Sequence, residues 1–149
     1  MAIQPSTARP PTDAAWHHRA LVQAARSFEA AVAAPVRDRD WWDRVGQRLA
    51  DLRAEFTEHV ATTEGPDGRY AALLADAPRL SRQVAALAAD HDRLQVRMDA
   101  LARRVGRPGT GVRSVRDAAG DLLAHLARHR QRGADLVYEA YATDIGGET

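Results

Sequence analysis

The chain has 149 residues, enough for one domain with its own hydrophobic core. It contains no cysteine, which excludes disulfides and thiolate metal sites. Its 21 basic residues, all of them arginine, balance 20 acidic residues to a net charge of +1, so we expect no nucleic-acid partner. No apolar run approaches the roughly 20 residues of a membrane span, and the N-terminus lacks the pattern of a secretory signal. We therefore expect a cytoplasmic protein that does not contact membranes.

Helix caps and helix breakers divide the chain into four long helical segments and one short one. The second long segment can be capped by Asp38 or Asp40 and should end before Gly65-Pro66, and Pro78 suits the first turn of the third. The expected helices are residues 12–34, 38 or 40 to 64, 70–76 (short), 78–105 and 114–143.

No segment alternates between apolar and polar residues for long enough to form a strand. The connections are mostly short, so neighbouring long helices should run antiparallel. The sequence therefore predicts an all-α, up-down-up-down four-helix bundle over residues 12–144. Residues 1–11 are expected to be a disordered lead and residues 145–149 a tail.

Three of the long helices carry a histidine within an apolar stripe whose members recur every three or four residues, the spacing of one helix face. A helix that buries this face carries its imidazole into the core, where the ring needs a hydrogen-bond partner or a metal ion. The stripes are Val45, Leu49, Leu52, Phe56, His59; Leu80, Val84, Leu87, His91, Leu94, Met98, Leu101, Val105; and Val115, Ala119, Leu122, Leu126, His129, Gly133, Leu136.

Histidines from all four long helices are predicted to lie at one depth of the bundle, away from its two tight turns. Measured from the turn that joins the first two helices, His18 and His59 differ in height by only about 7 Å, and His91 and His129 match as closely across the other turn. Either His17 or His18 can point inward. A single histidine on an apolar face is more often a hydrogen-bonded core residue than a ligand. Four helices that each carry a histidine at the same depth by chance are improbable, however, and this favours a ligand cluster. Asp90 and Asp92, which flank His91, are expected to be solvated or paired with nearby arginines.

These segments together resemble a hemerythrin-like (HHE cation-binding) domain, a four-helix bundle that holds a non-heme di-iron site. The resemblance covers nearly the whole chain. The matching segments, in chain order, are His18-Arg-Ala-Leu, Phe56-Thr-Glu-His59, Asp90-His91-Asp-Arg-Leu94, and His129 followed by Leu136-Val137-Tyr138.

The chain departs from the family pattern where the family has bridging carboxylates, four residues after the second- and fourth-helix histidines. These positions hold Thr63 and Gly133. Glu64 follows one residue later and reaches the site only if the helix unwinds at its end. Alternatively, His125 takes the fourth-helix ligand position and His129 the carboxylate position.

The resemblance and the histidine pattern together predict a metal site formed by His18, His59, His91 and His129, with Glu64 as the oxygen donor. His17, His125 and Glu55 are less favoured ligands. The expected metal is non-heme iron, mononuclear or dinuclear; zinc or another transition metal is an alternative, and a heme is disfavoured.

Two functions follow from this interpretation. The first is binding or sensing of iron or of a small exogenous ligand such as oxygen or nitric oxide. The alternative is a metal-free bundle that has become an interaction or regulatory module. No phosphate loop or activated nucleophile appears in the sequence, so whether the protein is an enzyme stays open.

Overall fold

A computed structural model describes residues 12–142, with side chains from residue 18 onward. The predicted lead and tail, the last two residues of the predicted domain, and the side chain of His17 lie outside the described residues. Within them the helices are α1 (Thr12–Ala33), α2 (Asp40–Glu64), α3 (Arg69–Asp76), a 3₁₀ turn η1 (Pro78–Leu80), α4 (Ser81–Val105) and α5 (Val112–Ala142).

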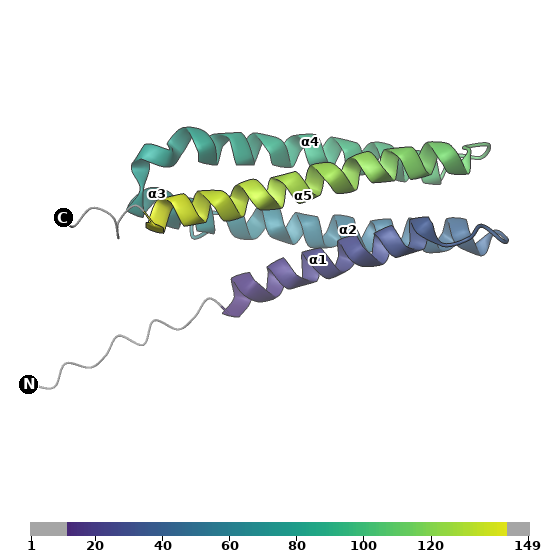
Figure 1. The fold of residues 1–149 in the computed structure, drawn as a ribbon, viewed down its shortest axis with the longest axis horizontal. Helices are drawn as coiled ribbons and strands as arrows, with labels where there is room; N and C mark the ends of the chain where they lie inside the picture. Colours follow the sequence, from purple (N-terminus) through teal and green to yellow (C-terminus); the bar gives the residue numbers. More distant parts are fainter. Residues whose placement is uncertain (1–11, 143–149) are drawn as a thin grey trace, which may run out of the picture.

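The four long helices form the predicted up-down-up-down bundle (Figure 1). Helix α1 packs on α2 and α4 packs on α5, and the two pairs meet through α2 with α4 and α1 with α5. Both tight connections, residues 34–39 and 106–111, lie at one end of the bundle, and α3 lies at the other (Figure 1). The described helices contain no segment with both the length and the apolar composition needed to cross a membrane.

Helix ends follow the local chemistry of the sequence. The carboxylate of Asp38 accepts a hydrogen bond from the backbone N–H of Asp40 at 3.0 Å, where α2 begins. Gly65 leaves the helix in an extended conformation and so ends α2 at Glu64. Gly109 has a φ of 84° in the turn between α4 and α5, a left-handed conformation that favours glycine. Pro78 starts η1, which runs directly into α4.

Arg116 of α5 ties the C-terminal end of α1 to the bundle. Its Nε donates to the Val32 carbonyl at 3.1 Å, and its Nη2 donates to the Ala34 carbonyl at 3.0 Å. The guanidinium also lies 5.8 Å from the ring centroid of Trp41, which is buried. One side chain therefore satisfies two carbonyl groups that lack partners at a helix end.

The core consists of two apolar clusters, one toward each end of the bundle. The larger lies toward the tight turns and is built from α1, α2, α4 and α5, whereas the smaller lies under α3 and is built from α3, η1, α4 and α5. Along α4 the larger cluster ends at Leu94 and the smaller begins at Leu87, and along α5 the corresponding residues are Leu126 and Leu136. His91 of α4 and His129 of α5 lie in this interval between the two clusters.

Candidate metal centre

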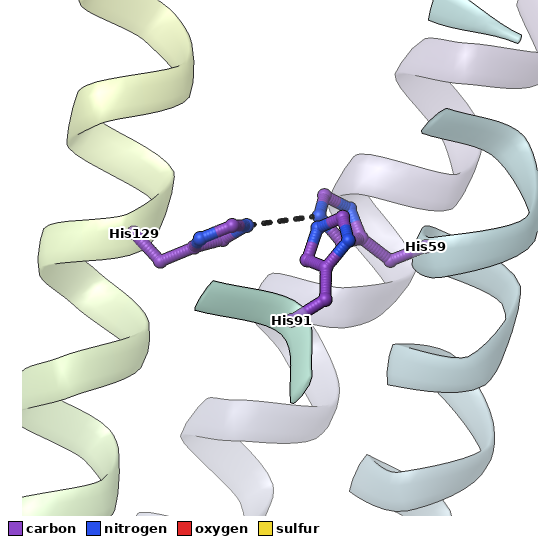
Figure 2. A group of neighbouring side chains, drawn as sticks. All are labelled: His59, His91 and His129. Atoms are coloured by element: carbon purple, nitrogen blue, oxygen red, sulfur yellow. Dashed lines mark hydrogen bonds between the residues drawn. The ribbon is translucent and has the colours of Figure 1, made fainter. Parts of the chain in front are cut away.

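Three of the predicted ligands, His59 of α2, His91 of α4 and His129 of α5, converge in the layer between the two apolar clusters (Figure 2). Each offers a ring nitrogen, and these three atoms all lie within 4.8 Å of one another. His91 and His129 are 2% exposed, and His59 is partly buried. The helical stripes carry them there: those of α4 and α5 supply apolar residues on both sides of His91 and His129, and that of α2 ends at His59.

His59 Nε2 and His129 Nε2 lie 3.3 Å apart, within hydrogen-bonding reach, as the dashed line in Figure 2 shows. This distance is long for a hydrogen bond from nitrogen, which usually spans about 2.7–3.2 Å. Two imidazole nitrogens bound at about 2.0–2.1 Å to one tetrahedral ion lie about 3.3 Å apart. The pair therefore has the spacing of two ligands of a single metal ion.

His91 occupies the third side of the cluster and has two polar neighbours. The Tyr70 hydroxyl lies 3.3 Å from His91 Nε2, and Glu64 Oε2 lies 3.4 Å from His91 Nδ1. At 3.4 Å the approach of Glu64 is longer than a usual hydrogen bond, so it pairs Nδ1 only weakly, although it raises the pKa of His91. A weakly paired buried nitrogen is costly in a metal-free core and is a natural position for a cation. Phe56 packs edge-on against this ring, with centroids 5.7 Å apart.

Asp90 lies behind His129 and joins α4 to α5. It is 2% exposed. Its Oδ2 lies 2.8 Å from Nδ1 of His129, and its Oδ1 lies 2.6 Å from Nε2 of His125, one turn earlier on α5. The expectation that Asp90 is solvated is therefore wrong. Arg93 does approach it, at 4.0 Å, but the short contacts are to the histidines.

The electrostatics of the layer favour neutral imidazoles. Burial, helped by the neighbouring His91 and His129, lowers the pKa of His59 to about 3. Burial also lowers the pKa of His91 and of His129, although Glu64 and Asp90 respectively oppose it. Neutral rings present lone pairs to a metal ion, whereas protonated rings do not.

The carboxylate of Asp90 and the hydroxyl of Tyr70, both beside the histidines, respond differently to burial. Burial alone would raise the pKa of Asp90, but hydrogen bonds with His125 and His129 outweigh it and hold this pKa below its usual value. Burial raises the pKa of the nearby Tyr70 hydroxyl to about 12, so this phenol is neutral.

The other predicted ligands have different surroundings. His18 is exposed on α1 and does not belong to the group of three, and the N-terminal end of α1 diverges from the other helices (Figure 1). His125 faces Asp90. Glu55 is partly buried but lies outside the group. Glu64 is the last residue of α2, and its carboxylate stands beside His91 although the helix continues up to it; the expected unwinding before Glu64 is not needed.

Sequence reasoning missed two residues that contact the cluster. Asp90 follows Leu87 by three residues and precedes Leu94 by four, so the same spacing rule that found His91 also places Asp90 among buried neighbours. Tyr70 was expected on the short helix, but only the fold shows that α3 places it against His91.

The two positions of the absent bridging carboxylates offer no metal donor in their place. Thr63 is buried, and its hydroxyl donates to the backbone carbonyl of His59 at 2.8 Å within its own helix. Gly133 has no side chain, and a Cβ built there meets no atom within 4 Å. A pair of ions would therefore lack both bridging groups, whereas a single ion needs neither.

Comparison with known families identifies the class of protein that this fold and site define. Residues 16–141 match the model of the hemerythrin HHE cation-binding domain. The chain therefore belongs to the hemerythrin HHE family, as the sequence motifs suggested. Searches of curated proteins and of solved structures found no match.

Proposed function

We propose that this protein binds one transition-metal ion through His59, His91 and His129. The observation that carries the proposal is the 3.3 Å separation of the facing His59 and His129 nitrogens, with His91 completing a group within 4.8 Å. Membership of a cation-binding family supports the same conclusion. Glu64 is the proposed oxygen donor, since its carboxylate already lies against His91.

The ligand set favours one ion of the first transition series. Imidazole nitrogens with a single carboxylate suit iron, zinc, copper or nickel better than magnesium or calcium, which prefer oxygen. We propose mononuclear non-heme iron first and zinc as the alternative. A di-iron pair of the family type does not fit this donor set, because Thr63 and Gly133 replace its bridging carboxylates.

An ion held by three protein ligands keeps a fourth position for a small molecule, and one that Glu64 also binds opens this position when the carboxylate leaves or the coordination expands; the ion acts there as a Lewis acid or a redox centre. We propose that the physiological role is binding or sensing of a small exogenous ligand, such as oxygen or nitric oxide, or of iron itself, in the cytoplasm. The protein contributes a partly dry site. Phe56 covers one side, the Tyr70 hydroxyl lies beside His91, and the apolar clusters exclude water above and below.

A metal-free bundle that acts as an interaction module is the competing function. It is supported by the contact between His59 and His129 and by the two hydrogen bonds of Asp90, which satisfy several imidazole nitrogens without an ion. In such a bundle the cluster would be a hydrogen-bonded polar layer and nothing more.

A cobalt titration with matched leucine variants separates the two functions. Co²⁺ bound by imidazoles in a site of low coordination number gives visible ligand-field bands, and we expect these to saturate at about one ion per chain. His91→Leu should abolish the bands while the metal-free protein stays as stable as the parent, because leucine fills the buried space without leaving an unpaired nitrogen.

His18→Leu is the control, because His18 is exposed and lies outside the group of three; its titration should match that of the parent. Absence of cobalt bands in the folded parent protein would refute the metal site and favour the interaction module. A large loss of bands in His18→Leu would instead add α1 to the ligand set.

A further inference from the structure

Asp90 makes closer contacts to the histidine layer than any other carboxylate in the described part of the chain. A carboxylate as buried as this one is costly unless its oxygens accept hydrogen bonds. Both oxygens do so, at 2.6 Å from His125 Nε2 and 2.8 Å from His129 Nδ1. The bonds link α4 to two successive turns of α5.

The contact determines which nitrogen of His129 carries the proton. An ionised carboxylate only accepts hydrogen bonds, so Nδ1 of His129 must be the donor. In a neutral imidazole the other nitrogen, Nε2, then keeps its lone pair. Nε2 is the atom that faces His59 across 3.3 Å, where the proposed ion would lie.

We propose that Asp90 is the positioning residue of the metal centre: it fixes His129 in the tautomer that turns a free Nε2 lone pair toward the ion, and it supplies a negative charge behind that ligand. This inference rests on the proposed metal-binding function. Asp90 is not itself a ligand, since both of its oxygens are engaged by imidazole N–H groups. Carboxylates placed in this way orient metal-bound histidines and strengthen them as ligands.

The placement also balances charge in a chain that lacks the bridging carboxylates of its family. Three neutral imidazoles leave the charge of a divalent ion uncompensated. Asp90 behind His129 and Glu64 beside His91 supply negative charge next to two of the ligands, and Arg93, 4.0 Å from Asp90, offsets part of it. The two bridging carboxylates are absent from α2 and α5, and Asp90 of α4 instead places a carboxylate behind the ligand His129.

His125 has a supporting part in this arrangement. It occupies the second oxygen of Asp90 and is itself only 12% exposed, so it keeps the carboxylate from turning away from His129.

The test compares Asp90→Asn with Asp92→Asn, since Asp92 is exposed on the same helix and its loss removes an equal charge. An asparagine at position 90 has one acceptor oxygen and one NH₂ group, so it cannot accept from both histidines. Zn²⁺ affinity, measured by competition with a chromophoric chelator, should fall about 10- to 100-fold in Asp90→Asn and less than about 3-fold in Asp92→Asn, where only the long-range charge effect operates.

The ¹⁵N NMR spectrum of the imidazoles gives a readout that does not depend on metal. In the metal-free parent protein His129 should be protonated at Nδ1, and in Asp90→Asn this preference should be lost or reversed. Circular dichroism establishes that the variant is folded. If it does not fold, the parent protein can still overturn the proposal, because His129 protonated at Nε2 would exclude the expected tautomer.

Each outcome has one meaning. A parent protein with His129 protonated at Nε2, or an Asp90→Asn variant with unchanged tautomer and unchanged Zn²⁺ affinity, would overturn the assignment of Asp90. A parent protein with the expected tautomer but no Zn²⁺ binding would refute the proposed function and reduce Asp90 to a structural tie. The expected tautomer together with a selective loss of affinity in Asp90→Asn would establish the positioning role.

Discussion

At the scale of single residues, the unusual feature is a polar layer of three imidazoles and an aspartate inside an apolar bundle. The rings of His91 and His129 are almost inaccessible, and a carboxylate beside them is equally buried. Nothing in the packing of a helical bundle requires such a layer, because leucines at these positions would continue the stripes above and below. A layer of this kind stabilises the protein only if its polar groups are paired, and one nitrogen of His91 is paired only weakly.

The depressed pKa values predict how the stability of the metal-free protein varies with pH. An imidazole in the unfolded chain binds a proton near pH 6.5, whereas His59 in the folded protein does so only near pH 3. Between these values the unfolded state binds more protons, so the free energy of unfolding must fall as the pH falls. His91 and His129, whose pKa values are also lowered, act in the same direction.

Urea unfolding of the metal-free protein between pH 7.5 and about 4, with a chelator present, checks this expectation. The midpoint should decrease steadily below about pH 6.5. His59→Leu should flatten the decrease. His18→Leu alters an exposed ring whose pKa is also lowered, by burial and by Arg130 and Arg69, so it should remove a smaller part and keep most of the decrease. Identical slopes in the parent and in His59→Leu would show that His59 titrates normally in the folded state.

Asp90 also shows what the sequence could and could not tell about single residues. On an ideal helix Asp90 is rotated by about 100° from its neighbour His91, and this rotation suggested that its side chain faces solvent. However, α4 packs against both α2 and α5, and its buried arc is wide enough to include both residues. The spacing of Asp90 from Leu87 and Leu94 was a signal in the sequence, but only the position of the second neighbouring helix shows that Asp90 is buried.

At the scale of the elements, the helix boundaries were the most predictable feature. Proline, glycine and aspartate at the predicted ends act locally, so the helix ends within the described residues lie at most three residues from the expected positions; the largest difference is at α4, where the 3₁₀ turn η1 takes the first three. The direction of the individual histidines was less predictable. His17 and His18 flank the apolar face of α1 equally, and only the packing of that helix shows His18 exposed.

The tie between α5 and the end of α1 leads to a prediction at this scale. Arg116→Ala removes two hydrogen bonds to the carbonyls of Val32 and Ala34 together with the contact to Trp41. We expect a loss of about 1–2 kcal/mol in the free energy of unfolding, measured by urea titration. Arg116→Lys should recover only part of this loss, because an ammonium group cannot reproduce the planar fork of a guanidinium.

Arg113→Ala is the matched control, since Arg113 is exposed about one turn earlier on the same helix. Its stability should change by less than about 0.5 kcal/mol. Equal effects of the two substitutions would mean that Arg116 contributes only its charge and that the end of α1 is held by other contacts.

At the scale of the whole molecule, the bundle explains why the histidines meet. Helices of similar length that turn back at one end bring residues equally far from the turn to one level, which is why His18, His59, His91 and His129 were predicted to converge. The last three do so, whereas His18 is exposed and lies outside the group. The same arrangement places α3 over the far end, where Tyr70 reaches the cluster. The depth of a residue in the bundle could thus be predicted from the sequence. The contact between Tyr70 and His91 could not, since it depends on how α3 folds back between α2 and α4.

The family and the site lead to different expectations for the number of ions. A typical member is expected to hold two irons between bridging carboxylates. In this chain the bridging positions are a threonine bonded to its own helix and a glycine, so neither supplies a carboxylate that could hold a second ion. The central claim is therefore a single ion held by histidines from α2, α4 and α5.

The metal content of the protein tests this claim most directly. Untagged protein, expressed with iron and zinc supplied and purified without a metal column, would be analysed by plasma mass spectrometry alongside a His91→Leu, His129→Leu double variant. We predict about one transition-metal ion per chain in the parent and none in the folded double variant. Folded parent protein without metal, a ratio near two, or a ratio unchanged in the double variant would contradict the account.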